Sequence, residues 1–567
     1  MAWLRIALCQ VASVVGDLAG NVERIRDALS QAEAAGADLA VFPELAVTGY
    51  PPEDLLLKPG FVADNLAALE KLAGASQSCT AVVGFVDEGL DLYNAAAVLA
   101  AGSVKGVYRK CRLPNYSVFD EERYFAPGPG PSELYLVGGV RVGVSVCEDA
   151  WDPTGPLVKE AAGGAELLVN INASPYYAGR LAERRRMLAT RAADCSCALV
   201  YLNTVGGQDE LVFDGASMVF GADGSLVASL PQFEEAVAVL DLEVRPTYRK
   251  RLLDPRGRHG GDPLPAVEVS AEPHPQRERA APPSSRHLSP EEEVYSALVL
   301  GTRDYVRKNG FSEVVVGLSG GVDSSLVATI AADALGPQAV HGVSMPSRFT
   351  SAASGADAAE LAKRLGIDYR TVPIEPAHEA VLAMLAPSFA GKPAGLAEEN
   401  VQSRLRGLVL MALSNKFGWL VLTTGNKSEL AVGYSTLYGD TAGGFAVIKD
   451  VPKTMVYKLC RWRNQSGEVI PQTVLEKPPT AELRPGQLDT DSLPPYEVLD
   501  PVLEAYVEGD LTAPELVEAG FAPELVAKVV RLVDLAEYKR RQSPIGVRVS
   551  PKAFGRDRRM PVTNAYR

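Results

Sequence analysis

The chain has 567 residues, which is too long for a single hydrophobic core and predicts at least two domains. Apolar residues make up 47% of it, which excludes an intrinsically disordered protein. The formal net charge of −14 argues against a binder of nucleic acid or of anionic membranes. The first ten residues lack the apolar stretch of a signal peptide, and no apolar run is long enough to span a bilayer. We therefore expect a cytoplasmic protein without membrane association.

The seven cysteines are odd in number and form neither a C-x-x-C pair nor a cluster with histidine. Most of them lie inside apolar runs, which favours buried free thiols over disulfides or a zinc site.

Over the first 245 residues, short apolar runs bounded by Gly, Pro, Asp or Asn alternate with segments of helical spacing. These runs predict buried strands at residues 4–9, 38–42, 81–86, 141–147, 167–172 and 198–203. The helical spacing predicts helices at residues 21–35 and 60–73. Strands that are apolar throughout need cover on both faces, so residues 1–245 are expected to form a layered α/β domain.

Residues 246–288 are rich in Pro, Arg, His and Ser, which predicts an interdomain linker. Ser289 and Pro290, followed by three glutamates, then predict the start of a helix. From there strands are expected at 314–318, 339–343, 369–373 and 419–423, and helices at 324–334, 356–365 and 400–416. This alternation predicts a second, doubly wound α/β domain over residues 289–567.

The strand at 314–318 runs into the sequence SGGVDS and then into a helix. Glycines let the backbone approach a ligand closely, and a helix N-terminus offers free N–H groups to a phosphate. The segment lacks the lysine of the G-x-x-x-x-G-K-[ST] loop. It resembles instead the S-G-G-x-D-S pyrophosphatase loop of ATP-dependent adenylating enzymes, which implies a Rossmann-like, adenine-nucleotide α-hydrolase-like fold. The resemblance implies ATP as co-substrate, with Asp323 as a Mg²⁺ ligand and ATP contacts at Gly317, Leu318, Ser319, Gly320, Gly321, Val322, Asp323 and Ser324.

Three later motifs, ENVQSR (399–404), TTGNKSE (423–429) and GYSTLYGD (433–440), follow that loop in order. Together they resemble the NAD synthetase family from about residue 288 to the C-terminus. The resemblance places Thr424 and Lys453 on ATP and makes Glu429 a second Mg²⁺ ligand. It implies that deamido-NAD is bound by Asn400, Glu429, Tyr434, Ser435, Thr436, Leu437, Asp440 and Lys539.

Two alternatives stay open for these basic residues. Lys453 can instead be a solvated surface lysine, and the basic tail from about residue 538 can be a solvated segment. Within that tail, Lys552 competes with Lys539 for the contact to the dinucleotide.

In the first half, Glu44 lies in VFPEL, Lys110 in VYRKCRLPNY and Cys147 in GVSVCEDAW. Each alone is compatible with a structural role. In this order and these contexts they resemble the carbon–nitrogen hydrolase (nitrilase) superfamily over residues 1–245, which implies an α-β-β-α sandwich. The resemblance makes Cys147 the nucleophile toward the amide of glutamine, Glu44 the general base and then acid, and Lys110 the oxyanion partner, with its charge favouring the thiolate.

The same resemblance implies that Tyr116, Ser174 and Arg180 hold the amino-acid end of glutamine. Arg180 suits a carboxylate because a guanidinium can bind both oxygens. Glu148 lies beside the nucleophile and is a candidate for assisting it.

These observations predict an amidotransferase that frees ammonia from glutamine and adds it to adenylated deamido-NAD, while ATP becomes AMP and pyrophosphate. One alternative is another amidotransferase with the same loop, of the GMP or asparagine synthetase type. Those families use a Cys-His-Glu glutaminase or an N-terminal catalytic cysteine, and here residue 2 is alanine. The other alternative is an amidase whose second half is a nucleotide-sensing module. We further expect only small-molecule substrates, a homo-oligomer, and an enclosed route for ammonia.

Overall fold

The computed structural model describes residues 2–253, 262–270 and 278–566. Contacts divide the chain into two compact units, Met1–Gln208 with Val212–His287, and Asp209–Leu211 with Leu288–Arg567. Among the described residues, no helix is both long and apolar enough to cross a membrane. All seven cysteines are free thiols, and six of them are buried, as the sequence predicts.

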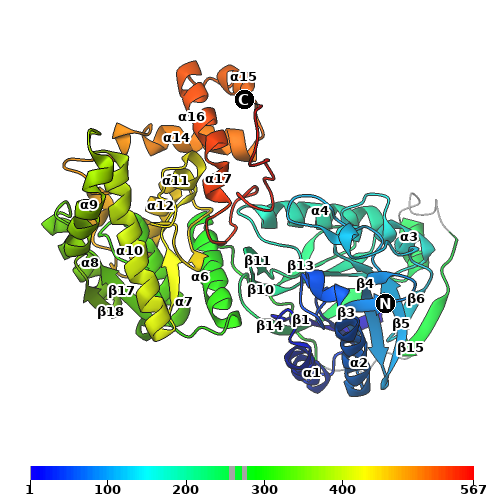
Figure 1. Ribbon diagram of the computed structural model, residues 1–567. Coiled ribbons are helices and arrows are strands. Elements are labelled where there is room, and N and C mark those ends of the chain that lie inside the picture. Colours follow the sequence, from blue (N-terminus) through cyan, green and yellow to red (C-terminus); the bar gives the residue numbers. More distant parts are fainter. Residues whose placement is uncertain (1, 254–261, 271–277, 567) are drawn as a thin grey trace. The chain divides into compact units, whose positions relative to one another are not determined.

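The first unit contains two large sheets (Figure 1). One has the order β14-β1-β2-β3-β4-β5, with bounds β14 (Ala236–Val244), β1 (Ala2–Gln10), β2 (Leu39–Val41), β3 (Thr80–Glu88), β4 (Leu92–Ala100) and β5 (Ser103–Arg109). The other has the order β13-β12-β9-β8-β7-β6-β15, with bounds β13 (Leu226–Ser229), β12 (Met218–Phe220), β9 (Ala198–Asn203), β8 (Leu167–Asn172), β7 (Val140–Val146), β6 (Leu134–Val137) and β15 (Ala266–Ser270). A separate hairpin joins β10 (Val205–Gln208) to β11 (Leu211–Asp214).

The two sheets pack face to face. Successive strand residues point to opposite faces of a sheet, so each strand contributes side chains both to the space between the sheets and to an outer face. Ile6 of β1 and Val144 of β7 belong to one apolar cluster that fills the space between the sheets. The neighbouring residue Ala7 instead joins a cluster with the helices α1 (Leu18–Ala34) and α2 (Pro59–Ala75). Helices α3 (Pro156–Gly163) and α4 (Arg180–Cys195) cover the outer face of the other sheet. The predicted α-β-β-α sandwich is therefore confirmed.

All six strands and both helices predicted in the first half are present, with ends shifted by up to three residues. Cys147 lies outside its predicted strand, because β7 ends at Val146 and Cys147 begins a 3₁₀ turn, η3 (Cys147–Ala150). The predicted linker also differs from the structure. It contains helix α5 (Thr247–Leu253) and strand β15, which pairs in parallel with β6. Residues 254–261 and 271–277 of the predicted linker lie outside the described residues.

The second unit is built on a parallel sheet with the order β18-β17-β16-β19-β20. Its strands are β16 (Val314–Gly317), β17 (Val340–Ser344), β18 (Asp368–Thr371), β19 (Leu420–Thr423) and β20 (Phe445–Ala446). The chain moves outward from β16 to β18 and then returns to place β19 on the other side of β16. This reversal confirms the doubly wound prediction and places the topological switch point at the carboxyl ends of β16 and β19, where such folds bind ligands.

Helices surround this sheet. They are α6 (Pro290–Lys308), α7 (Val322–Leu335), α8 (Ala352–Leu365), α9 (Glu375–Phe389), α10 (Leu396–Phe417) and α12 (Lys453–Asn464). The hydroxyl of Ser289 accepts from the N–H of Glu292, so the predicted helix start is confirmed. A separate helical cluster is formed by α11 (Lys427–Val432), α14 (Tyr496–Leu503), α15 (Ala513–Glu518) and α16 (Pro523–Leu535) around residues such as Leu499 and Val529. The short helix α17 (Glu537–Arg540) comes directly after α16.

Part of the basic tail is buried, which differs from the solvated segment expected for most of its charges. Arg540 bonds Glu537 at 2.8 Å, and Arg548 bonds Asp557 at 2.6 Å. Acidic partners close in sequence explain how these guanidinium groups can be buried.

Candidate active sites

In the first unit, Glu44, Lys110 and Cys147 all lie just beyond the carboxyl ends of strands. Glu44 follows β2, Lys110 follows β5 directly, and Cys147 follows β7 directly. All three side chains are buried. Cys147 has a φ of +46°, a left-handed conformation that is uncommon for residues with a Cβ and that is concentrated at functional turns.

Lys110 is surrounded by acceptors. Its Nζ lies 2.7 Å from Oε1 of Glu44 and 2.9 Å from both carboxylate oxygens of Glu121. Asn94 donates to Oε1 of Glu44 at 2.7 Å, and the N–H of Ala173 donates to Oε2 at the same distance. The carboxylate of Glu44 is therefore held in one orientation by donors on both oxygens.

Glu121 is a member of this cluster that the sequence analysis missed. It lies in the short turn η2 (Glu121–Arg123), and Tyr50 donates to it at 2.9 Å. Burial raises the pKa of Glu121 to about 7, against the opposing effect of Lys110. Three adjacent acidic residues in a loop usually face solvent, so the sequence alone carried no signal for this contact.

The charges around Cys147 determine its resting state. Burial raises the pKa of the Cys147 thiol well above its usual value, Glu44 raises it further, and Lys110 opposes both. Burial alone would lower the pKa of Lys110, but Glu121 and Glu44 raise it well above normal. Lys110 therefore stays an ammonium, and the thiol stays protonated until a base removes its proton. Lys110 lowers the pKa of the Cys147 thiol, as expected, but burial raises that pKa by more.

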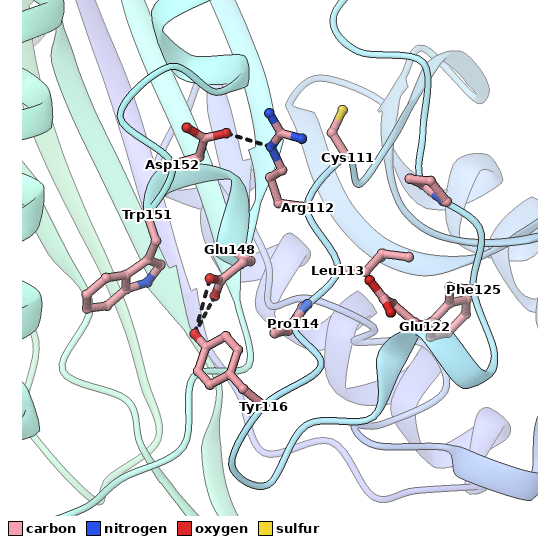
Figure 2. A pocket seen from close by; sticks show the side chains of 11 residues that line it. Cys111, Arg112, Leu113, Pro114, Tyr116, Glu122, Phe125, Glu148, Trp151 and Asp152 are labelled. Carbon is pink, nitrogen blue, oxygen red and sulfur yellow. Dashed lines mark hydrogen bonds and ion pairs between the residues drawn. The ribbon is translucent and has the colours of Figure 1, made fainter.

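A pocket of approximately 630 Å³ lies beside this cluster, and Glu148, the residue after the nucleophile, is part of its wall (Figure 2). Tyr116 donates to both carboxylate oxygens of Glu148 at 3.1 Å. The remaining lining residues are Cys111, Arg112, Leu113, Pro114, Glu122, Phe125, Pro127, Trp151 and Asp152. Carboxylates, a guanidinium and a phenol beside apolar side chains suit a small zwitterion such as an amino acid.

The other two predicted glutamine contacts are placed differently. Arg180 lies over the Trp151 ring, 4.2 Å from its centroid, and bonds Glu183 at 3.0 Å. Ser174 is buried, and its N–H donates to Asn203 at 2.8 Å. Neither residue lines the pocket, although Arg180 packs on Trp151, which does.

In the second unit, the SGGVDS segment forms the turn between β16 and α7, as predicted. Gly320 has a φ of +76°, and a Cβ there would lie 2.2 Å from the carbonyl oxygen of Ser354, so only glycine fits. The hydroxyls of Ser319 and Ser324 are 3.1 Å apart, and Ser324 also donates to the carbonyl of Gly321. These contacts hold the turn at the N-terminus of α7 in a shape suited to an anion.

Asp323 and Glu429 meet at Lys453. The ammonium of Lys453 bonds Oδ2 of Asp323 at 2.5 Å and Oε1 of Glu429 at 3.1 Å, and Asn426 donates to Oδ1 of Asp323 at 2.9 Å. Lys453 is only 2% exposed, so the alternative of a solvated surface lysine is wrong. Burial raises the pKa of Glu429 to about 8, while Lys453 opposes that shift.

The described residues contain no group of three or more His, Cys, Asp or Glu side chains placed to hold a metal ion. A Mg²⁺ ion that accompanies a nucleotide needs only one or two carboxylates, because phosphate oxygens and water complete its coordination. The pair Asp323 and Glu429 fits that requirement, since both carboxylates already converge on one cation.

Five of the predicted dinucleotide residues, Tyr434–Leu437 and Asp440, lie in the segment after α11, whereas Asn400 lies in α10, Glu429 in α11 and Lys539 in α17. Thr436 donates to Asn400 at 2.7 Å, and the N–H of Thr436 donates to Asp440 at 2.6 Å. Lys539 donates to the carbonyls of Gly433 and Ser435, whereas Lys552 pairs with the exposed Asp510. Thr424 and Leu437 are half-buried. Lys539 is therefore the lysine that contacts the predicted segment.

Comparison with known proteins gives matches for both halves. Residues 5–250 match the carbon–nitrogen hydrolase family, and residues 294–543 match the NAD synthase family. The glutamine-dependent NAD(+) synthetase of Thermotoga maritima is 49% identical over all of both chains. That of Aquifex aeolicus is 46% identical over 99% of this chain and all of its own. The glutamine-dependent NAD+ synthetase of Acinetobacter baumannii, solved with ADP, has a TM-score of 0.75 at 40% identity and covers 99% of each chain.

Proposed function

Because the chain belongs to the family of glutamine-dependent NAD(+) synthetases, we propose that it makes NAD from deamido-NAD, ATP and glutamine. One observation carries this proposal. A single chain holds a buried Glu–Lys–Cys set at the strand ends of a nitrilase-like sandwich, and an SGGVDS turn at the switch point of a doubly wound sheet. The first arrangement releases ammonia and the second consumes it.

In the glutaminase reaction, Cys147 attacks the side-chain amide carbon of glutamine while Glu44 accepts the thiol proton. The ammonium of Lys110 stabilises the oxyanion, and it is suited to this role because two carboxylates keep it charged. Glu44 then gives its proton to the leaving ammonia. A water molecule, activated by Glu44, hydrolyses the thioester to glutamate and restores the thiol.

In the synthetase reaction, the carboxylate of deamido-NAD attacks the α-phosphorus of ATP and pyrophosphate leaves. Ammonia then attacks the activated carbonyl carbon, AMP leaves, and the carboxylate has become the amide of NAD. The SGGVDS turn offers N–H groups and hydroxyls to the pyrophosphate, and Lys453 offers a buried positive charge. A Mg²⁺ ion held by Asp323 and Glu429 would neutralise phosphate charge during adenylation.

Glutamine, ATP and deamido-NAD are each bound by the residues that the sequence resemblance implies. Tyr116 and Glu148 form one wall of the pocket and bind the amino-acid end of glutamine, with Glu148 on the amino group. Arg180, which packs on the lining residue Trp151, and Ser174 are expected to reach the same end of glutamine although they do not line the pocket. Thr424 and residues 317–324 bind ATP. Deamido-NAD is bound by Asn400, Glu429, residues 434–437, Asp440 and Lys539.

One assay separates this function from the alternatives. NAD, AMP and pyrophosphate should form in equal amounts from ATP, deamido-NAD and either glutamine or ammonium. A GMP-type or asparagine-type amidotransferase would be inert with deamido-NAD. An amidase with a nucleotide-sensing module would release ammonia from glutamine without consuming ATP.

We also propose that the protein is a homo-oligomer. In α9 only His378 is buried, and α9 packs on α10. The exposed fractions of Met384 in α9 and of Leu408 and Met411 in α10 are 77%, 64% and 37%, so both helices carry exposed apolar side chains. A second copy of the chain would bury them. The double variant Leu408→Glu/Met411→Glu should lower the mass measured by light scattering; an unchanged mass would place the subunit contact elsewhere.

A further inference from the structure

We propose that Asp149 is a positioning residue for the glutaminase reaction: its carboxylate fixes the loop that carries Lys110 against the turn that begins with Cys147. The inference rests on the proposed roles of those two residues. Asp149 contacts neither of them, and it is completely buried. Its function follows from the groups that its two oxygens bind.

Each oxygen of Asp149 accepts two hydrogen bonds. Oδ1 accepts from the backbone N–H groups of Cys111 at 3.1 Å and Arg112 at 2.9 Å, which directly follow Lys110. Oδ2 accepts from the N–H of Val146 at 3.1 Å, which directly precedes Cys147, and from the Tyr108 hydroxyl at 2.9 Å. Three of the four donors are thus backbone groups next to the nucleophile or the oxyanion partner.

These donors come from different sheets. Tyr108 and the loop after it belong to β5 of the six-stranded sheet, whereas Val146 ends β7 of the seven-stranded sheet. Neighbouring strands within one sheet are aligned by their ladders, but two sheets that pack through side chains can shift relative to each other. One buried carboxylate between them sets their relative position at the point where Lys110 must face Cys147. A displacement of 1 Å in such a site costs about 10²-fold in rate.

Asparagine at this position tests the idea sharply. Its amide group keeps one acceptor oxygen but replaces the other with an NH₂ donor. The NH₂ cannot face Cys111 and Arg112, which only donate. It can face Tyr108, because a hydroxyl also accepts, and it then loses the bond to Val146. Asp149→Asn should therefore release the nucleophile turn while the Lys110 loop stays bound.

Protonation of Asp149 should have the same effect as asparagine. Burial raises the pKa of Asp149 to about 6, opposed by the bonds from Val146, Arg112 and Tyr108 and by the charge of Lys110. The other titratable groups that act in this region are Cys111, beside Tyr108, and Glu160 of α3, whose own pKa burial raises well above normal. The Cys111 thiol, whose pKa burial raises to about 11, stays neutral near pH 6. Glu121 beside Lys110 has a pKa of about 7 and is present in every variant compared, so a step that Asp149→Asn removes belongs to Asp149.

The experiment compares full-length wild type, Asp149→Asn and Tyr108→Phe, with Asp38→Asn as matched control. Asp38 is another buried aspartate of the same unit that accepts a backbone N–H, from Arg5 at 2.6 Å, away from the catalytic set. In Asp149→Asn the glutamine-dependent kcat should fall about 10²-fold, with KM for glutamine changed less than about threefold. The ammonia-dependent rate should not change, and Asp38→Asn should keep both rates.

A purely structural role of Asp149 would leave the pH profile of the glutamine-dependent kcat unchanged, so this profile is a second test. In wild type the glutamine-dependent kcat should fall as the pH drops through about 6, and Asp149→Asn should lack this step. Tyr108→Phe should shift the step to higher pH, because the Tyr108 hydroxyl lowers the pKa of Asp149. This shift remains measurable if Asp149→Asn does not fold.

Three outcomes would overturn the proposal: wild-type kcat in Asp149→Asn, an equal loss in Asp38→Asn, or an unshifted step in Tyr108→Phe. Failure of the proposed function itself is recognised separately, because Cys147→Ala would then still use glutamine.

Discussion

The ammonium nitrogen of Lys110 lies 2.7 Å from Oε1 of Glu44, and neither side chain is exposed to solvent. Glu121 supplies a second carboxyl group at 2.9 Å, so one buried cation lies between two buried acidic side chains. Removal of the cation leaves uncompensated buried charge, which is among the most costly changes a protein interior can undergo.

Lys110→Met should therefore abolish glutamine hydrolysis and lower the free energy of unfolding of the first unit by about 3–5 kcal/mol. The double variant Lys110→Met/Glu121→Gln should recover part of that stability without activity, since one anion is gone but the oxyanion still lacks its partner. Denaturant unfolding and a glutamate assay measure the two effects. Equal stability of the single and double variants would mean that Glu121 does not share the charge of Lys110.

Cys147→Ala should lose glutamine-dependent NAD synthesis and retain ammonia-dependent synthesis, because the nucleophile serves only the first unit. Both rates are measured with the same ATP and deamido-NAD concentrations. Normal use of glutamine by this variant would show that another group is the nucleophile.

Asp323→Ala should abolish synthesis with either nitrogen source. Asp323 holds Lys453 and, in our proposal, Mg²⁺, and both are needed for adenylation rather than for the supply of ammonia. Glutamine hydrolysis, followed as glutamate release, should persist. Full ammonia-dependent activity in this variant would contradict the assignment of the SGGVDS turn.

Metal binding should depend on pH through Glu429. Its pKa, raised to about 8 by burial, means that it is largely protonated at pH 7 and must release that proton to bind a cation. In the presence of ATP, Mn²⁺ affinity measured by electron paramagnetic resonance should rise about fivefold from pH 7 to 8 and level off above about pH 9. Glu429→Gln in the same series should show only the pH dependence of ATP itself. The same pH dependence of Mn²⁺ affinity in the wild type and in Glu429→Gln would exclude Glu429 as a ligand.

The sequence predicted those parts of the fold and site that depend on local signals. Apolar runs and glycine-rich turns located the predicted strands, and Glu44, Lys110 and Cys147 occur in recognisable strand-end contexts. Asp149 could not be assigned in this way, because its partners come together only when two sheets pack. Glu121 could not be assigned because its partners Lys110 and Tyr50 reach it only when the chain folds. Strand β15 was missed since its Pro-rich flanks resemble a linker, although the alternation in Ala266–Ser270 is typical of a strand. The buried state of Lys453 likewise depends on Asp323 and Glu429, which are distant in sequence.

The transfer of ammonia is expected to occur within the protein. At pH 7 free ammonia is mostly ammonium, which lacks the lone pair needed to attack the adenylate, so release into water would waste most of the nucleophile. Synthesis with ¹⁵N-amide glutamine in an excess of unlabelled ammonium measures this directly, since the label in the amide of NAD reports which pool was used. We expect the product to carry mostly label. Cys147→Ala under the same conditions should give unlabelled product and serves as the control. Dilution of the label to the level of the bulk pool would mean that ammonia equilibrates with solvent before it reaches the adenylate.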